Sequence, residues 1–176
     1  RAMLWARNLL ESPESPVILD LETSGKDPAT AEIVQIGILA INGQILLDSL
    51  VRPTQLIPPG ATAVHHITDE MVKDAPTLKE LYPRLKEILC NAVVVIYNVG
   101  YDAPLLKANL TRANLPKINP AWVTCAMLAF ADYVGEWDEI HGNNRWQKLP
   151  EGDHTAIGDC RQTLEIIKKM AANAQP

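Results

Sequence analysis

The segment from Val17 to Gly25, VILDLETSG, places two carboxylates inside an otherwise apolar stretch. Its aliphatic run predicts a strand over residues 16–22 that is buried in the core. Asp20 and Glu22 are two residues apart, and side chains with this spacing point to the same face of a strand. Two acids held side by side repel each other and resist removal from water. A fold that contains this strand therefore needs a nearby group that neutralises both carboxylates.

The apolar periodicity predicts strands at 16–22, 33–41, 44–51, 92–97 and 121–124. Asn42-Gly43 is a strong hairpin signal, so the second and third strands are expected to be antiparallel neighbours. Helices are predicted at 1–11, from Thr68, from Thr77, at 103–113, at 125–133 and at 155–172. This order predicts an α/β fold whose mixed five-stranded sheet combines an antiparallel three-strand meander with parallel strands and is flanked by helices.

The domain organisation follows from the first prolines. Ser-Pro-Glu-Ser-Pro at 12–16 ends the first helix and forms a short linker. We therefore expect an N-terminal helix and linker at residues 1–15 and one domain at 16–176, which the length of 176 residues suits. The apolar side of the first helix is predicted to consist of Leu4, Trp5, Leu9 and Leu10.

Composition excludes several classes of function. The formal net charge is −5, whereas a protein that coats duplex DNA by bulk electrostatics is normally basic. No apolar run has the length needed to cross a bilayer, so no membrane association is expected. The three cysteines, Cys90, Cys125 and Cys160, are odd in number and far apart, and they are interpreted as small core residues in a reducing, cytoplasmic compartment.

Three further chemically active residues follow predicted element boundaries. Asp102 comes just after the 92–97 strand, where open α/β sheets place their sites, and His154 and Asp159 open the last helix. Each has an ordinary explanation as well: Asp102 as a helix cap, Asp159 as an acid favoured by the helix dipole, and His154 as a loop residue. Four converging carboxylates would instead be stabilised by hard divalent cations, whose preferred ligands are oxygen atoms.

The three motifs D-x-E, N-x-x-x-D and H-x-x-x-x-D, at residues 20–22, 98–102 and 154–159, resemble in order and spacing those of the DEDDh 3′–5′ exonucleases. This DnaQ-like family has the ribonuclease H-like fold and includes bacterial proofreading subunits and ribonuclease T. The resemblance covers about residues 16–172 and implies a metal-dependent hydrolase. Its substrate would be the 3′ end of single-stranded DNA or RNA, and its product 5′-mononucleotides.

The resemblance also implies roles for individual residues. Asp20, Glu22, Asp102 and Asp159 would hold two Mg²⁺ or Mn²⁺ ions, and His154 would be the general base that takes a proton from the attacking water. Histidine suits this role because its ordinary pKa, about 6.5, leaves it mostly neutral near pH 7.

The resemblance further implies a second set of residues that would bind the substrate. The backbone from Leu21 to Thr23 would hold the terminal sugar, Asn98 would lie beside the site, and Val64, His65 and Tyr101 would pack on the terminal bases. A structural loop role explains His65 equally well.

Some positions depart from the family pattern. Tyr97 and Tyr101 stand where His and Phe are frequent, and Gln35 stands where Glu is frequent. The Trp-rich segment 135–153 replaces a Leu-rich helix and a longer loop. Its RWQK stretch at 145–148 could grip a single strand, but the favoured interpretation is that Trp146 fills the core, as Trp122 and Trp137 are expected to do.

Two other functions remain open at the level of sequence. One is a module that holds nucleic-acid ends without cutting them, which would be expected to have lost one of the acids or the histidine. The other is an oligoribonuclease-type enzyme specific for RNA. Preference for DNA or RNA depends on how the site treats the 2′-hydroxyl group of the sugar, and the motifs do not show this. The sequence also leaves open a homodimer or a larger nucleic-acid-processing assembly.

Overall fold

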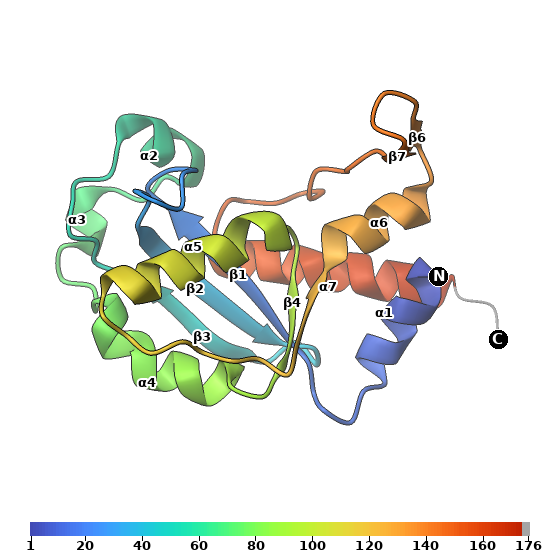
Figure 1. Cartoon of the computed structure of the whole chain (residues 1–176), viewed down its shortest axis with the longest axis horizontal. Coiled ribbons are helices and arrows are strands. Elements are labelled where there is room, and N and C mark those ends of the chain that lie inside the picture. Colours follow the sequence, from blue (N-terminus) through green and yellow to red (C-terminus); the bar gives the residue numbers. More distant parts are fainter. Residues whose placement is uncertain (174–176) are drawn as a thin grey trace.

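A mixed five-stranded sheet forms the centre of the computed structural model, which describes residues 1–173. Its strands are β1 Val17–Thr23, β2 Ile33–Ala40, β3 Ile45–Leu50, β4 Val93–Ile96 and β5 Trp122–Cys125. Their order across the sheet is β3-β2-β1-β4-β5. β1 pairs antiparallel with β2 and parallel with β4, and β4 pairs parallel with β5 (Figure 1). The predicted combination of a meander with parallel strands is confirmed.

Helices cover both faces of this sheet (Figure 1). They are α1 Ala2–Leu10, α2 Pro59–His65, α3 Asp69–Val72, α4 Leu78–Leu89, α5 Val99–Arg112, α6 Ala126–Val134 and α7 Ala156–Ala172. One hydrophobic cluster joins α1, α6 and α7 to one face of the sheet, and a second joins α4 and α5 to the other. Because alternate residues of β1 face opposite sides, Ile18 belongs to the first cluster and Leu19 to the second.

Local signals explain where several elements begin and turn. Gly43 has a φ of 92°, which the Asn42-Gly43 hairpin requires, and the turn lies between β2 and β3 as predicted. Thr77 and Glu80 form a complete capping box at the start of α4. Thr155 caps α7 by accepting a hydrogen bond from the backbone N–H of Gly158.

The contact of α7 with β2 depends on a glycine. A Cβ atom placed on Gly37 would lie 2.5 Å from the backbone carbon of Ala156 and 2.7 Å from its oxygen. Only a residue without a side chain allows the first turn of α7 to lie so close to the sheet. This approach brings Asp159 to the same side of the sheet as Asp20 and Glu22.

The N-terminal helix packs on the same core, although the predicted set of contacts is partly wrong. Ala2, Ala6 and Leu9 are its buried residues, whereas Leu4 is 60% exposed. Trp5 is partly buried, and its indole N–H donates to the Thr124 hydroxyl over 3.0 Å. Small alanines permit the close packing of α1 against α7, so the buried stripe follows Ala2 and Ala6 instead of the larger Leu4.

Three features differ from the elements expected. α2 and the short hairpin of β6 Trp137–Asp138 with β7 Asn143–Asn144 were not predicted. α5 begins at Val99, about one turn before the predicted start at residue 103, so that Pro104 lies inside the helix. The extra turn places Asp102 inside the helix instead of at its cap. Residues 174–176, the last of the predicted domain, lie outside the described residues.

The expected burial of cysteines and tryptophans is only partly correct. Cys160 is buried and Cys125 half-buried, but Cys90 is exposed at the end of α4, and all three are free thiols. Trp122, Trp137 and Trp146 are 66%, 57% and 62% exposed, so their assignment to the core is wrong. Within residues 1–173, no helix is long and apolar enough to cross a membrane.

Candidate metal and active site

Three elements place the predicted acidic residues and the histidine around one cleft of about 660 Å³. Asp20 and Glu22 project from β1, Asp102 lies in the first turn of α5, and Asp159 lies in the first turn of α7, with His154 just before that helix. All five residues line the cleft. The parallel strands β1 and β4 end at this edge of the sheet, which explains why residues so distant in sequence converge there.

Part of this cluster has the geometry of a cation site. One ligand atom each from Glu22, His154 and Asp159 lies within 4.8 Å of the other two. The Oδ1 atom of Asp159 is buried and has no hydrogen-bond partner in the described structure. A buried carboxylate oxygen without a partner is costly, and coordination to a divalent cation would satisfy it. Glu22 and Asp159 therefore supply carboxylate oxygens that fit a hard metal ion, and a ring nitrogen of His154 lies beside them.

The repulsion expected from the sequence is present. Burial raises the pKa of Glu22 to about 8, with further contributions from the negative charges of Asp159, Asp102 and Asp153. Burial and the charges of Asp102, Asp159 and Glu22 hold the pKa of Asp20 well above its ordinary value. Asp20 thus interacts with each of the other three acids.

Asp102 and Asp159 are subject to the same effect. Burial raises the pKa of Asp102 to about 7, and this residue is only 4% exposed. The pKa of Asp159 is also raised, chiefly by burial, although the neighbouring His154 acts in the opposite direction. Without a cation, the four carboxylates cannot all be ionised without strong repulsion.

A tight turn presents His154 to the cleft. His154 has a φ of 56°, in the left-handed region that few non-glycine residues adopt. Next to it, the carboxylate of Asp153 accepts hydrogen bonds from the backbone N–H and the hydroxyl of Thr155, at 2.9 and 2.7 Å. The turn is therefore held by its own side chains, and His154 itself is exposed to solvent.

Gln35, one of the departures from the family pattern, has a structural role. It lies opposite Glu22 in the pairing of β1 with β2. Its side-chain oxygen accepts a hydrogen bond from the backbone N–H of Ala156 over 3.0 Å. Gln35 thus satisfies one of the free N–H groups of the first turn of α7, the turn that carries Asp159.

Among the predicted substrate contacts, Leu21, Asn98 and Tyr101 line the cleft. The Tyr101 hydroxyl donates to the carbonyl of Gly25 over 2.9 Å and lies 2.9 Å from the hydroxyl of Thr23. The side chain of Thr23 is buried and also donates to Gly25. These bonds fix the aromatic ring of Tyr101 at the end of β1.

The structure places His65 and Val64 differently. His65 is only 5% exposed, and its Nδ1 accepts a hydrogen bond from the backbone N–H of Ile67. Burial lowers the pKa of His65. Val64 is half exposed on α2, and neither residue lines the cleft. His65 is the last residue of α2, and its packing on terminal bases stays a prediction.

Trp146 is the residue at this site that the sequence interpretation misplaced. It lines the cleft together with Gln147, Lys148 and Leu149, instead of filling the core. The buried Tyr97 anchors the segment, because its hydroxyl donates to the carbonyl of Gln147 over 2.7 Å. The basic and aromatic composition of the RWQK stretch was the one signal in the sequence for a binding role. The sequence did not show that this segment folds onto the cleft.

Comparison with known proteins agrees with the fold. Residues 17–167 match a protein family described as exonuclease, of the ribonuclease T type. Because this match spans most of the sequence, the chain belongs to that exonuclease family. The family includes DnaQ-like relatives associated with DNA polymerase III.

Individual relatives differ greatly in length. An uncharacterised exonuclease, CP81, of Escherichia phage 186 is 36% identical over 171 residues, which cover 88% of this chain and 87% of that protein. The PolC-type DNA polymerase III of Clostridium perfringens is 29% identical over 157 residues, 86% of this chain but 11% of that protein. Escherichia coli Exonuclease I, solved with a 5cy-dT13 oligonucleotide, has a TM-score of 0.72 and 16% identity, covering 92% of this chain and 42% of that one.

Proposed function

We propose that the chain is a metal-dependent 3′–5′ exonuclease that releases 5′-mononucleotides from the 3′ ends of single-stranded nucleic acid. The observation that carries this proposal is the convergence of four carboxylates and His154 on one cleft. Membership of the exonuclease family supports hydrolysis of a terminal phosphodiester. The DEDDh motif pattern supports the 3′–5′ direction.

The four acids would hold two Mg²⁺ or Mn²⁺ ions. Asp20 would be one of these ligands, because it lines the cleft and its pKa responds to the charges of Asp102, Asp159 and Glu22. When bound, the ions supply the positive charge that attracts the phosphate and stabilises charge developing on its oxygens. This local charge would also allow a chain with a net charge of −5 to bind nucleic acid.

The proton transfer would be the task of His154. Its exposed ring reaches the cleft beside Glu22 and Asp159, where a water molecule can approach a bound phosphate. A ring nitrogen of His154 would accept a proton as the water oxygen attacks phosphorus. The bond from phosphorus to the 3′ oxygen of the preceding nucleotide then breaks, that oxygen takes up a proton from water, and a 5′-mononucleotide leaves.

The walls of the cleft suit a single strand. Tyr101 and Trp146 would stack on bases, Leu21 and Asn98 would contact the terminal nucleotide, and Lys148 would meet the phosphate backbone. Stacking of this kind tolerates any base sequence. Exonuclease I, which shares the fold, has been solved in complex with an oligonucleotide, and this supports a single-stranded substrate here.

We also propose that residues 16–176 are the exonuclease unit and that residues 1–15 are an extension packed on it. The family match over residues 17–167 supports this division. The much greater length of the PolC-type relative supports action within a larger protein or nucleic-acid-processing assembly.

The proposed function can be tested with 5′-labelled single-stranded DNA and RNA of the same sequence, in Mn²⁺, Mg²⁺ or EDTA. We expect a ladder that shortens from the 3′ end, requires a divalent metal and is absent with His154→Ala. The ratio of DNA to RNA cleavage would identify the preferred substrate. Intact label with tight binding would indicate an end-binding module, and intact label without binding would exclude free single strands as the substrate.

A further inference from the structure

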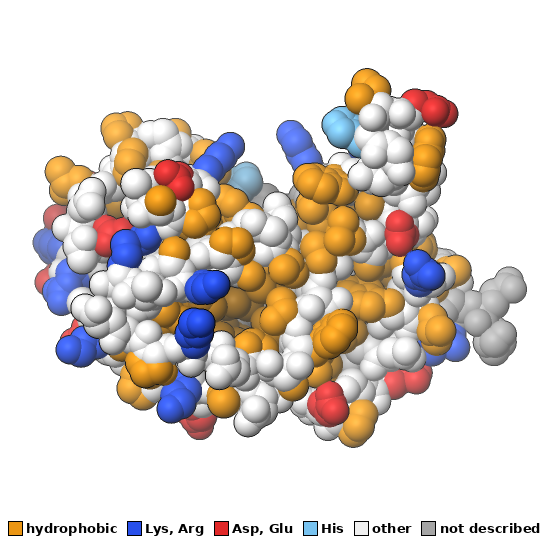
Figure 2. Space-filling model, viewed as in Figure 1, with side chains coloured by type: hydrophobic (Ala, Val, Ile, Leu, Met, Phe, Trp, Pro, Cys, Tyr) orange, Lys and Arg blue, Asp and Glu red, His pale blue; other side chains and the backbone are white. Residues whose placement is uncertain are grey.

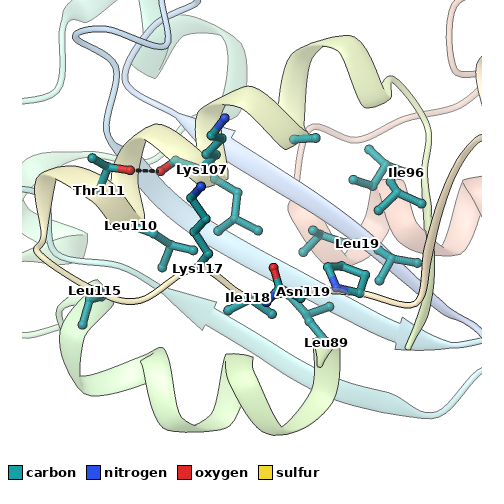
Figure 3. A pocket seen from close by; sticks show the side chains of 15 residues that line it. Leu19, Leu89, Ile96, Lys107, Leu110, Thr111, Leu115, Lys117, Ile118 and Asn119 are labelled. Carbon is teal, nitrogen blue, oxygen red and sulfur yellow. Dashed lines mark hydrogen bonds between the residues drawn. The ribbon is translucent and has the colours of Figure 1, made fainter. Parts of the chain in front are cut away.

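A second cavity, of about 180 Å³, lies on the face of the sheet that carries α4 and α5 (Figure 3). Its floor is formed by Leu19, Val94 and Ile96 of the sheet, and its walls include Leu110 of α5 and Ile118 of the α5–β5 loop. It shares no lining residue with the catalytic cleft. Figure 2 shows that hydrophobic side chains surround a hollow on this face of the molecule.

The cavity exists because, in the described part of the chain, no helix covers the β4–β5 side of this face. The chain from α5 to β5 crosses it as a loop, and Val123 of the edge strand β5 remains 38% exposed. The Thr111 hydroxyl donates to the carbonyl of Lys107 over 2.9 Å, so this polar group in the wall is already satisfied. Apolar cavities of about 150 Å³ accommodate a benzene ring. The cavity therefore has room for one large apolar side chain and is too small for a lipid acyl chain.

The charge around the cavity is opposite in sign to that of the whole chain. Lys107 and Lys117 line it without any acidic residue of the described chain, and Figure 3 shows the amino groups of both lysines directed toward the same side. Within residues 1–173, no carboxylate lies within ion-pair distance of either lysine. An occupant would gain from carrying negative charge beside its apolar group.

We propose that this cavity is a docking site for a peptide segment of a partner protein, in which a large apolar side chain is flanked by Asp or Glu. The apolar side chain would fill the hollow over Leu19 and Ile96, and the carboxylates would meet Lys107 and Lys117. Nucleic acid fits less well because its bases are polar on their edges and the hollow is lined by aliphatic groups. The proposed metal ligand Asp102 lies on the same helix as Lys107, so a docked partner would sit at a fixed position relative to the nuclease cleft.

Fluorescence anisotropy with the labelled peptide Gly-Glu-Asp-Phe-Asp-Glu-Gly and the whole chain would test the proposal. We expect saturable binding that weakens at least 10-fold in Lys107→Glu and Lys117→Glu. Lys79→Glu removes an exposed lysine of α4 outside the cavity and should bind as the unaltered protein does. Val123→Phe, which fills the cavity from the exposed edge strand, should also abolish binding. All four variants should keep their nuclease activity, because none of the altered residues lines the catalytic cleft.

Matched peptides separate this site from simple charge attraction. A peptide with Ser in place of Phe should bind at least 10-fold more weakly, and one with Lys in place of the acids should not bind. Equal binding of the Phe and Ser peptides, or no saturation by 1 mM, would overturn the proposal. Displacement of the peptide by a single-stranded oligonucleotide would overturn it too, because it would assign the surface to nucleic acid. Peptide binding is measured without metal or substrate, so it does not depend on whether the cleft cuts nucleic acid.

Discussion

At the scale of single residues, the carboxylates of the cleft are held in an environment that opposes their ionisation. Burial and mutual repulsion raise the pKa of Glu22 to about 8 and that of Asp102 to about 7. In the unfolded chain these groups ionise at ordinary values. As pH rises from about 4.5 toward 8, the unfolded state therefore loses protons that the folded, metal-free state retains, and the free energy of unfolding falls.

Glu22→Gln should therefore stabilise the metal-free protein at pH 8, by about 3 °C or more in Tm, and have little effect at pH 4.5. Thermal unfolding in EDTA at both pH values measures this. Glu139→Gln, at an exposed position, is the control and should change neither value. A variant with the same or lower Tm than the unaltered protein at pH 8 would contradict the account of repulsion.

His154→Ala should lower turnover by a factor of about 10² or more while Mn²⁺ binding persists, because the variant removes the proposed base and keeps the four acids. Single-turnover cleavage and calorimetric Mn²⁺ titration separate the two properties. Asp159→Asn provides the comparison, since it should weaken metal binding and cleavage together. Undiminished turnover in His154→Ala would exclude the histidine as the base.

At the scale of elements, the geometry of the proposed active site depends on how α7 meets the sheet. Gly37 allows the close approach, and Gln35 binds the N–H of Ala156 at the start of the helix. Both contacts act on the turn that carries Asp159. The separate segment 145–149 reaches the cleft through the hydrogen bond from Tyr97 to Gln147.

Gly37→Ala should destabilise the protein by about 1–3 kcal/mol, because the new methyl group overlaps the backbone of Ala156. Activity should fall as well, since α7 must move and carries Asp159 with it. Urea unfolding and the cleavage assay provide both measurements. Gly60→Ala is the matched control, because a Cβ there meets no atom within 4 Å.

Trp146→Ala should raise KM for single-stranded DNA at least 5-fold and change kcat less, because it removes a stacking surface and no reacting group. Trp122→Ala removes a similarly exposed tryptophan outside the cleft and should leave KM unchanged. Tyr97→Phe should reproduce part of the KM effect by releasing the segment. Equal effects at Trp146 and Trp122 would show that Trp146 has no specific role in binding the substrate.

At the scale of the whole molecule, cation binding should be coupled to folding. The proposed ligands come from β1, α5 and α7, so the complete site exists only in the folded chain. Mn²⁺ at about 100 times its Kd should raise Tm by roughly 5–10 °C at pH 8, which corresponds to about 2.7 kcal/mol. Asp20→Asn should lose most of this shift and all cleavage. A variant that still cuts at an ordinary metal concentration would contradict a role for Asp20 in holding the ions.

The sequence alone determined the local structure and the identity of the chemical groups. Apolar periodicity located the five strands of the sheet, Asn42-Gly43 located the hairpin, and Thr77 marked the start of α4. These signals are readable because they act between residues that are close in the chain. The three motifs also indicated the exonuclease family before any geometry was known.

Tertiary structure alone decided which residues are buried and which line a cleft or a cavity. Trp146 belongs to the cleft and His65 is buried, although the sequence favoured a core position for the first and allowed a substrate contact for the second. The alanine face of α1 and the cavity beside Lys107 were equally hidden. Each depends on which surfaces meet after the chain folds, and contacts between residues distant in sequence leave no periodic pattern by which they could be predicted.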